Sequence, residues 1–301
     1  MNNSYNDSYE GVFPVIPAPF SNDGEYVDYL AWERLIIHAI DVGSSGIAIF
    51  GAGTEFYKLS ASEKSEMLRI AVSLCKDKLP VLVTISNHAT NLAVKEAKQA
   101  VSDGAAIINI FPPSFASPSP NSIIRHITCI AKAVDVPVMV QYAPELTGQK
   151  IDLDVFAKIS QETKHNLLIK VEANPTGPTI SAIHTASNGG YTMAVGNAGL
   201  YMYDALVRGA RIIMPGLAMV ELYISFYHKF ITGNIDKAYD TYKELLPYIV
   251  ALGQDNEIFV SLEKKVLMKK GFLSNSVCRE PNRIPDETTV GILMKCLKKI
   301  L

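Results

Sequence analysis

The chain has 301 residues, of which 48% are hydrophobic and 19% are charged, so it is long enough for one large core or two modest domains. Its formal net charge of -2 gives no global field that attracts nucleic acid or an anionic membrane. The longest apolar runs are far shorter than a membrane span, so we expect neither nucleic acid nor a membrane as a partner.

The cysteines and histidines are dispersed. No pair of cysteines has the spacing of a zinc or redox site, and no HExxH or HxxxH pattern occurs, so the sequence predicts no metal site. Cysteines of this kind favour a reduced, cytoplasmic protein. Residues 1–10 are polar and carry no basic-then-apolar signal, and we interpret them as a frayed tail.

Short β-branched runs alternate with longer amphipathic stretches along the chain. The expected strands are Val12–Ile16, Gly46–Phe50, Pro80–Ile85, Ala106–Ile110, Pro137–Gln141, Leu167–Val171, Tyr191–Gly196 and Ala210–Met214. The expected helices that follow them are Tyr29–Val42, Ser62–Cys75, Thr90–Asp103, Ser122–Val134, Leu153–Gln161, Thr179–Ser187, Gly199–Arg208 and Ala218–Thr232. Ser60 and Glu63 have the spacing of a capping box before the second helix.

Eight strand–helix units of about 25 to 30 residues each predict a (β/α)8 TIM barrel over residues 11–232. After Thr232 the strand signal stops, and residues 233–301 are expected to form a helical C-terminal extension from Asn234–Gly253, Glu257–Lys270 and Asp286–Leu301. A doubly wound open sheet is the alternative. The turn after the first strand, Pro17-Ala18-Pro19-Phe20, lacks the Gly-rich pattern typical of that fold.

Lys170 is the most informative residue. It lies in the apolar run Leu167–Val171, where an unpaired ammonium group costs several kcal/mol or titrates at a lowered pKa. Such a lysine is a nucleophile whose natural partner is a carbonyl group. The alternative is that the strand ends near Lys170 and the ammonium group reaches water. Lysines on the C-terminal helices, such as Lys264 and Lys270, are interpreted as solvated.

Two further features lie at strand ends, where barrels carry their chemistry. The run Gly51-Ala52-Gly53-Thr54-Glu55 suits a loop whose backbone N–H groups bind a carboxylate, although an ordinary glycine-rich turn is the alternative. If Lys170 points into the barrel, Leu168 and Glu172 share its side, whereas Ile169 and Val171 face the helices. Glu172 is then a candidate partner for the ammonium group, or a cap for a neighbouring loop.

The order of motifs resembles the dihydrodipicolinate synthase / N-acetylneuraminate lyase family of class I, Schiff-base-forming aldolases. The resemblance covers about Gly11 to Arg283, with GxxxE after the second strand, PPxF after the fourth, APxLTG after the fifth, the lysine of the sixth and the glycine ending the seventh. It implies a covalent imine on Lys170 with pyruvate or another small 2-oxo acid, no other cofactor, and a homo-oligomer, either a dimer or a tetramer.

The chain departs from the family pattern at the proton relay. The family's relay Thr/Tyr/Tyr falls on Ala52, Phe115 and Gln141. The carboxylate-binding arginine of its dihydrodipicolinate synthases falls on Leu146, where its sialic acid lyases also carry leucine. Gln141 and Tyr142 are candidate catalytic residues beside Lys170, and a bulge is needed for Tyr142 to replace a side chain one position earlier. The candidate substrate-binding residues are Gly53, Thr54, Phe115, Leu146, Glu172 and Gly196.

Three hypotheses follow. The first is a Schiff-base lyase of aldolase or dehydratase type, and Glu55-Phe56-Tyr57 resembles a motif of sugar-acid dehydratases in the family. The second is a non-catalytic or repurposed barrel that binds a 2-oxo acid or sugar acid. The third is a lysine-independent hydrolase or isomerase on the same fold, for which no Ser-His-Asp pattern exists. We expect specificity to lie in the loops after the fourth, fifth and seventh strands.

Overall fold

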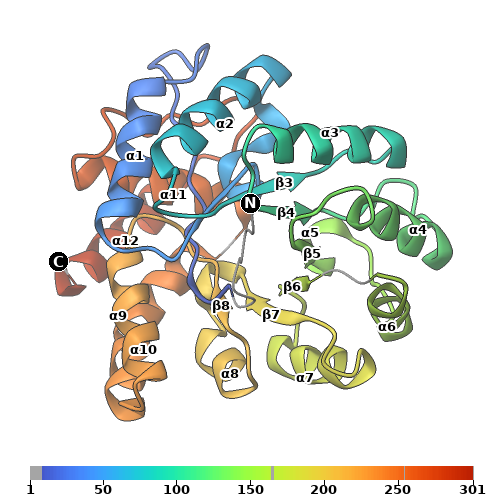
Figure 1. The fold of residues 1–301 in the computed structure, drawn as a ribbon. Coiled ribbons are helices and arrows are strands. Elements are labelled where there is room, and N and C mark those ends of the chain that lie inside the picture. Colours follow the sequence, from blue (N-terminus) through green and yellow to red (C-terminus); the bar gives the residue numbers. More distant parts are fainter. Residues whose placement is uncertain (1–8, 164–165, 254, 301) are drawn as a thin grey trace.

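A computed structural model describes residues 9–163, 166–253 and 255–300. Within these ranges eight parallel strands form one sheet in the order β1-β8-β7-β6-β5-β4-β3-β2. Val15 closes the sheet through parallel bridges to Ala48 and Gly216, so the strands form the central barrel and the helices surround it (Figure 1). The predicted (β/α)8 barrel is confirmed. Residues 1–8 of the predicted tail lie outside the described residues.

The strands occupy nearly the predicted positions. Only the first strand begins earlier and only the fifth ends later than expected, by one residue each. The strands are β1 (Gly11–Val12), β2 (Ile47–Ile49), β3 (Val81–Ile85), β4 (Ile107–Ile110), β5 (Val138–Tyr142), β6 (Leu167–Val171), β7 (Thr192–Val195) and β8 (Ile212–Ile213).

A helix follows each strand. The helices around the barrel are α1 (Tyr29–Asp41), α2 (Ala61–Cys75), α3 (Thr90–Ser102), α4 (Pro120–Ala131), α6 (Leu153–Glu162), α7 (Thr176–Ala186), α8 (Met202–Val207) and α9 (Val220–Ile231). The predicted capping box starts α2, with the Glu63 N–H donating to Ser60 Oγ and the Ser60 N–H donating to Glu63 Oε2. Short turns in the strand-end loops are η1 (Ala52–Thr54), η2 (Phe56–Lys58), α5 (Pro144–Thr147) and η3 (Asn197–Gly199).

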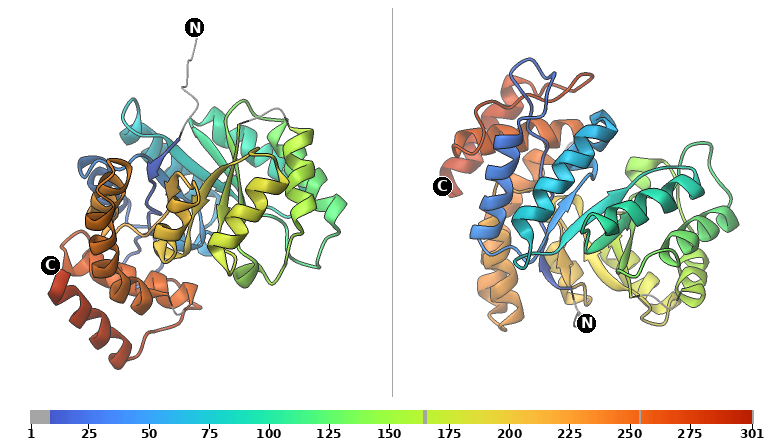
Figure 2. Two further views of the ribbon diagram at one scale, coloured as in Figure 1. Left: turned by 90° about the horizontal axis from the view of Figure 1, so that it is seen from below. Right: turned by 45° about the horizontal axis from the view of Figure 1, so that its top comes forward.

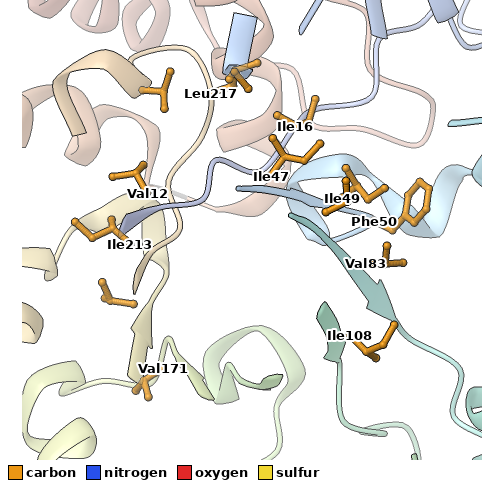
Figure 3. Packing of buried hydrophobic residues seen from close by; sticks show 14 of the residues in the cluster. Val12, Ile16, Ile47, Ile49, Phe50, Val83, Ile108, Val171, Ile213 and Leu217 are labelled. Carbon is orange, nitrogen blue, oxygen red and sulfur yellow. The ribbon is translucent and has the colours of Figure 1, made fainter. Parts of the chain in front are cut away.

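The strands bury both of their faces. Side chains such as Ile49, Val83 and Val171 face the helices and pack in the outer layer of the core (Figure 3). The inner layer fills the barrel with one side chain from each strand or its direct extension: Phe13, Ala48, Leu82, Ile107, Met139, Leu168, Ala194 and Ile212, together with Met214. Because side chains alternate along a strand, the next inward positions carry Thr84, Asn109, Gln141 and Lys170. The polar residues therefore form a second inward layer above an apolar one.

The C-terminal helices α10 (Ile235–Leu252), α11 (Asn256–Lys269) and α12 (Glu287–Ile300) lie beside α1 and α9 on one side of the barrel (Figure 2). Their buried side chains belong to the same hydrophobic cluster as the outer layer of the barrel. No helix in the described part of the chain is long and apolar enough to cross a membrane.

One sequence interpretation of these helices is wrong. Lys264 is not a solvated residue but is 1% exposed, and its Nζ donates to Glu55 and to the Val277 carbonyl. Lys270 likewise donates to the Ala218 carbonyl and to Glu221. Both lysines have partners on segments distant in the sequence, which a local helical pattern does not reveal.

Candidate active site

A cavity of about 520 Å³ opens at the C-terminal ends of the strands. The strand ends and their loops supply most of its wall, and the turn between α10 and α11 supplies the rest. The lining residues are Val15, Gly51, Ala52, Gly53, Gln141, Ala143, Glu145, Leu146, Lys170, Glu172, Asn174, Asn197, Ala198, Leu200, Tyr201, Met214, Pro215, Ile249, Val250, Gly253, Asp255, Asn256 and Phe259. The predicted residues Gly53, Gln141, Leu146, Lys170 and Glu172 are among them.

Lys170 and Glu172 form an ion pair in this cavity. Both side chains point inward from β6, as the alternation predicts, and Lys170 Nζ lies 3.1 Å from Glu172 Oε1. Lys170 is only 8% exposed. The ammonium group is therefore buried but not unpaired, and Glu172 offsets the desolvation that the sequence alone left unexplained.

Glu172 is held by groups from three strands. Besides Lys170, its carboxylate accepts a hydrogen bond from Gln141 Nε2 on β5 at 2.7 Å and one from the Asn197 N–H after β7 at 3.1 Å. Burial alone raises the pKa of Glu172, but the Lys170 charge and these hydrogen bonds outweigh it, so the pKa lies below its usual value. Glu172 is therefore an anion at neutral pH.

Gln141 is held in turn by a residue that the sequence reasoning missed. Asn109 on β4 is 2% exposed, and its Nδ2 donates to Gln141 Oε1 at 3.0 Å and to Thr84 Oγ1 at 3.2 Å. The signal was available in the sequence, because Asn109 interrupts the apolar run of β4 as Lys170 interrupts that of β6. Polar side chains of four adjacent strands thus form one hydrogen-bonded chain that ends at Lys170.

The loop after β2 borders the cavity with its backbone. Gly51, Ala52 and Gly53 line the wall, and a side chain at Gly53 would press against Val15. Thr54 does not line the cavity. It is fully buried, and its hydroxyl donates to the Ile16 carbonyl at 2.8 Å, which corrects the expectation that this hydroxyl binds substrate.

Glu55 also turns away from the cavity. Its buried carboxylate accepts from Lys58 and from Lys264 on α11, so this loop is fastened to the C-terminal helices.

Two other candidates lie outside the cavity. Tyr142 faces the helices and packs its ring against Phe156. The described strand β5 pairs in regular register without a bulge, so Tyr142 stays on the side opposite Gln141. Phe115 is 86% exposed in the loop after β4 and is not part of the wall. Both expectations are corrected by this geometry.

Gly196 lies against Glu172 outside the cavity. It does not line the cavity, but a Cβ atom there would lie 2.0 Å from Glu172 Oε1. The absence of a side chain at Gly196 makes room for the carboxylate of Glu172. Leu146 lines the cavity, is 49% exposed and presents an apolar surface there.

The wall opposite the strands comes from the C-terminal extension. Asp255, Asn256 and Phe259 lie at the start of α11 and line the cavity, as does Tyr201 after η3. The specificity loops predicted after β5 and β7 are present in the wall, whereas the loop after β4 does not line it. The sequence predicts a break between these two helices, but no local pattern shows that it borders the cavity, because its position depends on the packing of α10 against α9.

The arrangement suits covalent chemistry at a lysine. A buried amine with an adjacent carboxylate at the end of a cavity can attack a carbonyl carbon and pass protons to and from its partner. Among the described residues, no group of three or more His, Cys, Asp or Glu side chains is arranged to hold a metal ion.

Comparison with known proteins gives the same family as the motif order. The model of the Dihydrodipicolinate synthetase family matches residues 8–300. The 4-hydroxy-tetrahydrodipicolinate synthase of Methanosphaerula palustris is 27% identical over 288 residues, which cover 94% of this chain and 97% of that protein. The L-2-keto-3-deoxyarabonate dehydratase of Azospirillum brasilense is 26% identical over 279 residues, which cover 90% of this chain and 87% of that protein.

Solved structures agree with the fold. Dihydrodipicolinate synthase from Rhodopseudomonas palustris superimposes with a TM-score of 0.88 at 25% identity, over 96% of this chain and 97% of that one. The 4-hydroxy-tetrahydrodipicolinate synthase of Methylacidiphilum fumariolicum SolV gives 0.90 at 21% identity, over 97% and 96%. The two relatives compared by sequence are both lyases. The chain belongs to the dihydrodipicolinate synthetase family and is an enzyme of the lyase class.

Proposed function

We propose that the enzyme is a Schiff-base-forming lyase that acts on a 2-oxo acid through Lys170. The observation that carries the proposal is the buried Lys170–Glu172 pair, 3.1 Å apart, in a cavity of about 520 Å³ at the strand ends. A lysine there has little structural use, because an apolar side chain would fill the same position without a desolvation cost.

The adjacent carboxylate supplies the proton transfers. The Lys170 ammonium passes a proton to Glu172, and the neutral amine attacks the ketone carbon of the substrate. Glu172 then returns the proton to the carbinolamine hydroxyl, which leaves as water, and a protonated imine remains on Lys170. The imine withdraws electrons from the next carbon, so that a C–C or C–O bond one position further can break.

The substrate carboxylate is assigned to the loop after β2. Ala52 and Gly53 open the turn η1, so their N–H groups have no partner within that turn, and both residues line the cavity. Backbone N–H groups in such a turn bind an anion without a charged side chain. Thr54 takes no part, because its hydroxyl is used by Ile16.

The remainder of the substrate is assigned a neutral, hydroxylated tail. Lys170 is the only cation that lines the cavity in the described part of the chain, whereas Glu145 and Asp255 add two carboxylates to its wall. A second carboxylate on the substrate would therefore meet like charges, and Leu146 offers it no hydrogen bond. Dehydration of a deoxy-2-oxo sugar acid fits this wall and the similarity to a 2-keto-3-deoxyarabonate dehydratase.

Borohydride trapping tests the proposal. Wild-type protein is incubated with pyruvate and sodium borohydride and then analysed by intact-mass and peptide mass spectrometry. We expect one reduced adduct per chain on the peptide that contains Lys170. Lys170→Arg is the matched control, because arginine keeps a cation beside Glu172 but forms no imine under these conditions.

An adduct of equal yield in Lys170→Arg, or no adduct with pyruvate and a panel of 2-oxo sugar acids, would contradict the proposal. The same panel, assayed without borohydride, distinguishes dehydration from aldol cleavage by the product formed. The homo-oligomeric assembly and the cytoplasmic location expected from the sequence stay predictions.

A further inference from the structure

The amide of Gln141 is placed between an anion and another amide. Its Nε2 donates to Glu172 Oε2 at 2.7 Å, and its Oε1 accepts from Asn109 Nδ2 at 3.0 Å. An ionised carboxylate only accepts hydrogen bonds, so the NH₂ end of Gln141 must face Glu172. The carbonyl end then faces β4, where it requires a donor.

Asn109 is the residue that supplies this donor. Both hydrogens of its NH₂ group are used, one by Gln141 Oε1 and one by Thr84 Oγ1. Its side chain is 2% exposed and lies between neighbouring strands, so water does not compete for these bonds. If the Asn109 amide were reversed, its oxygen would face the oxygen of Gln141, and the Gln141 amide would have to reverse as well.

The pair of amides thus has two self-consistent orientations. In the observed one, Gln141 donates to Glu172 and stabilises an anion. In the reversed one, Gln141 presents its oxygen to Glu172 and suits only a protonated carboxyl group. A buried arrangement in which two acceptor oxygens face each other costs free energy, because neither has a donor. The low local dielectric raises this cost, so the two amides reverse together or not at all.

We propose that Asn109 is a positioning residue that, by donating to Gln141 Oε1, favours the direction in which the Gln141 amide donates to Glu172 and thereby keeps Glu172 as the proton acceptor of the site. The proposal rests on the function assigned above to Lys170 and Glu172. It adds a residue that touches neither the cavity nor the reacting atoms and that acts through Gln141.

The charged and titratable groups around Glu172 are few. Lys170 of β6 contacts it directly, and Glu145, Tyr201 and Asp255 are the other titratable residues that line the cavity in the described chain. Glu145 accepts from the Asn174 N–H and Asp255 pairs with Arg283, so these two carboxylates have partners of their own. A change at Asn109 alters none of these contacts.

The test measures the protonation of Glu172 directly. Protein labelled with ¹³C at the glutamate carboxyl groups is titrated by NMR, and Glu172→Gln identifies the resonance by its loss. In wild type we expect a midpoint below the usual value for glutamate. In Asn109→Leu, which keeps the number and branching of the side-chain heavy atoms and removes the donor, we expect the midpoint to rise by about one pH unit.

Two further variants separate positioning from packing. Thr84→Val removes the acceptor on the far side of Asn109 and leaves the Asn109–Gln141 bond, so its midpoint stays near that of wild type. Asn109→Asp keeps the shape but places a second acceptor beside Gln141, and the midpoint rises as in Asn109→Leu. Rates of pyruvate trapping are recorded on the same samples, and their acid limb should move with the midpoint.

An unchanged Glu172 midpoint in folded Asn109→Leu overturns the inference, as does an equal rise in Thr84→Val. The titration needs no substrate. A wild-type protein that forms no adduct with any 2-oxo acid contradicts the proposed function, whereas the midpoints still decide the role of Asn109.

Discussion

On the proposed function, Glu172 is the residue whose charge state sets the reactivity of Lys170. It contacts Lys170, Gln141 and the Asn197 N–H, and each of these contacts favours its ionised form. The side chain at Gly196 is absent, which leaves space for the carboxylate in this position. The carboxylate is therefore both the counter-ion of the lysine and the nearest proton acceptor.

Replacement of this residue by Glu172→Gln tests its role as an acid–base group. We expect kcat to fall by about 10² to 10⁴, because the amide cannot accept the proton of Lys170. The lowered pKa of Glu172 predicts that wild-type activity holds above the usual glutamate range and falls as the pH drops through that lowered value. The acid limb should be absent from the residual activity of Glu172→Gln.

Rate–pH profiles of wild type, Glu172→Gln and Glu66→Gln provide the measurement. Glu66 is partly exposed and pairs with Arg69 on α2, so its variant controls for the loss of one negative charge. If Glu172→Gln kept more than a tenth of the wild-type kcat, Glu172 would not be the acid–base group.

At the scale of elements, the segment after α11 binds the start of α2 to the loop before α1. The Arg279 guanidinium donates two hydrogen bonds to Glu63 and others to the carbonyl oxygens of Gly24, Glu25 and Lys58. Its hydrogen bonds hold the pKa of Glu63 at about 2. The planar guanidinium group donates in several directions at once, and a single ammonium group cannot make the same set of hydrogen bonds.

Arg279→Met should lower the free energy of unfolding by about 2 to 4 kcal/mol at pH 7, because several polar groups lose their donor. The depressed pKa of Glu63 contributes stability that is fully present above about pH 4.5 and is lost as the pH falls toward 2. The difference between wild type and Arg279→Met should therefore shrink on acidification through this window.

Urea unfolding at pH 7 and pH 3 measures this difference. Arg279→Lys serves as the control that keeps the charge, and we expect it to lie between wild type and Arg279→Met. A difference that is as large at pH 3 as at pH 7 would show that the carbonyl contacts alone hold this segment.

At the scale of the whole molecule, the barrel and the C-terminal helices are joined by buried charges. Glu55 in the loop after β2 pairs with Lys264 of α11, and Lys58 pairs with Glu257 of the same helix. The outer hydrophobic cluster also runs without interruption from the barrel into α10 and α12. We expect the two regions to unfold in a single transition.

Lys264→Met should cost about 3 to 5 kcal/mol, because it leaves the Glu55 carboxylate buried with one partner fewer. The double variant Glu55→Gln/Lys264→Met should recover part of that loss, since neither charge is then left alone. Denaturant unfolding of both variants, followed by fluorescence and circular dichroism, measures the coupling. Equal losses in the single and the double variant would contradict a stabilising role for the pair.

The features that the sequence predicts correctly are those that local patterns encode. The period of two on β6 placed Lys170 and Glu172 inside the barrel, and the same period explains why Gln141 lines the cavity and Tyr142 does not. The prediction for Lys264 was wrong, because its partner Glu55 lies 209 residues earlier in the chain. The prediction for Thr54 was also wrong. Its hydroxyl donates to the Ile16 carbonyl, which comes close only when the barrel closes.

The wall of the cavity has a genetic consequence. Lys170 lies in β6 and Glu172 directly follows that strand, whereas Asp255, Asn256 and Phe259 are encoded far downstream, at the start of α11. On the proposed function, part of the substrate choice is therefore inherited on a stretch of the gene that is separate from the nucleophile. A lineage can exchange the turn between α10 and α11, by recombination or by point mutation, and acquire new substrates while its nucleophile stays untouched.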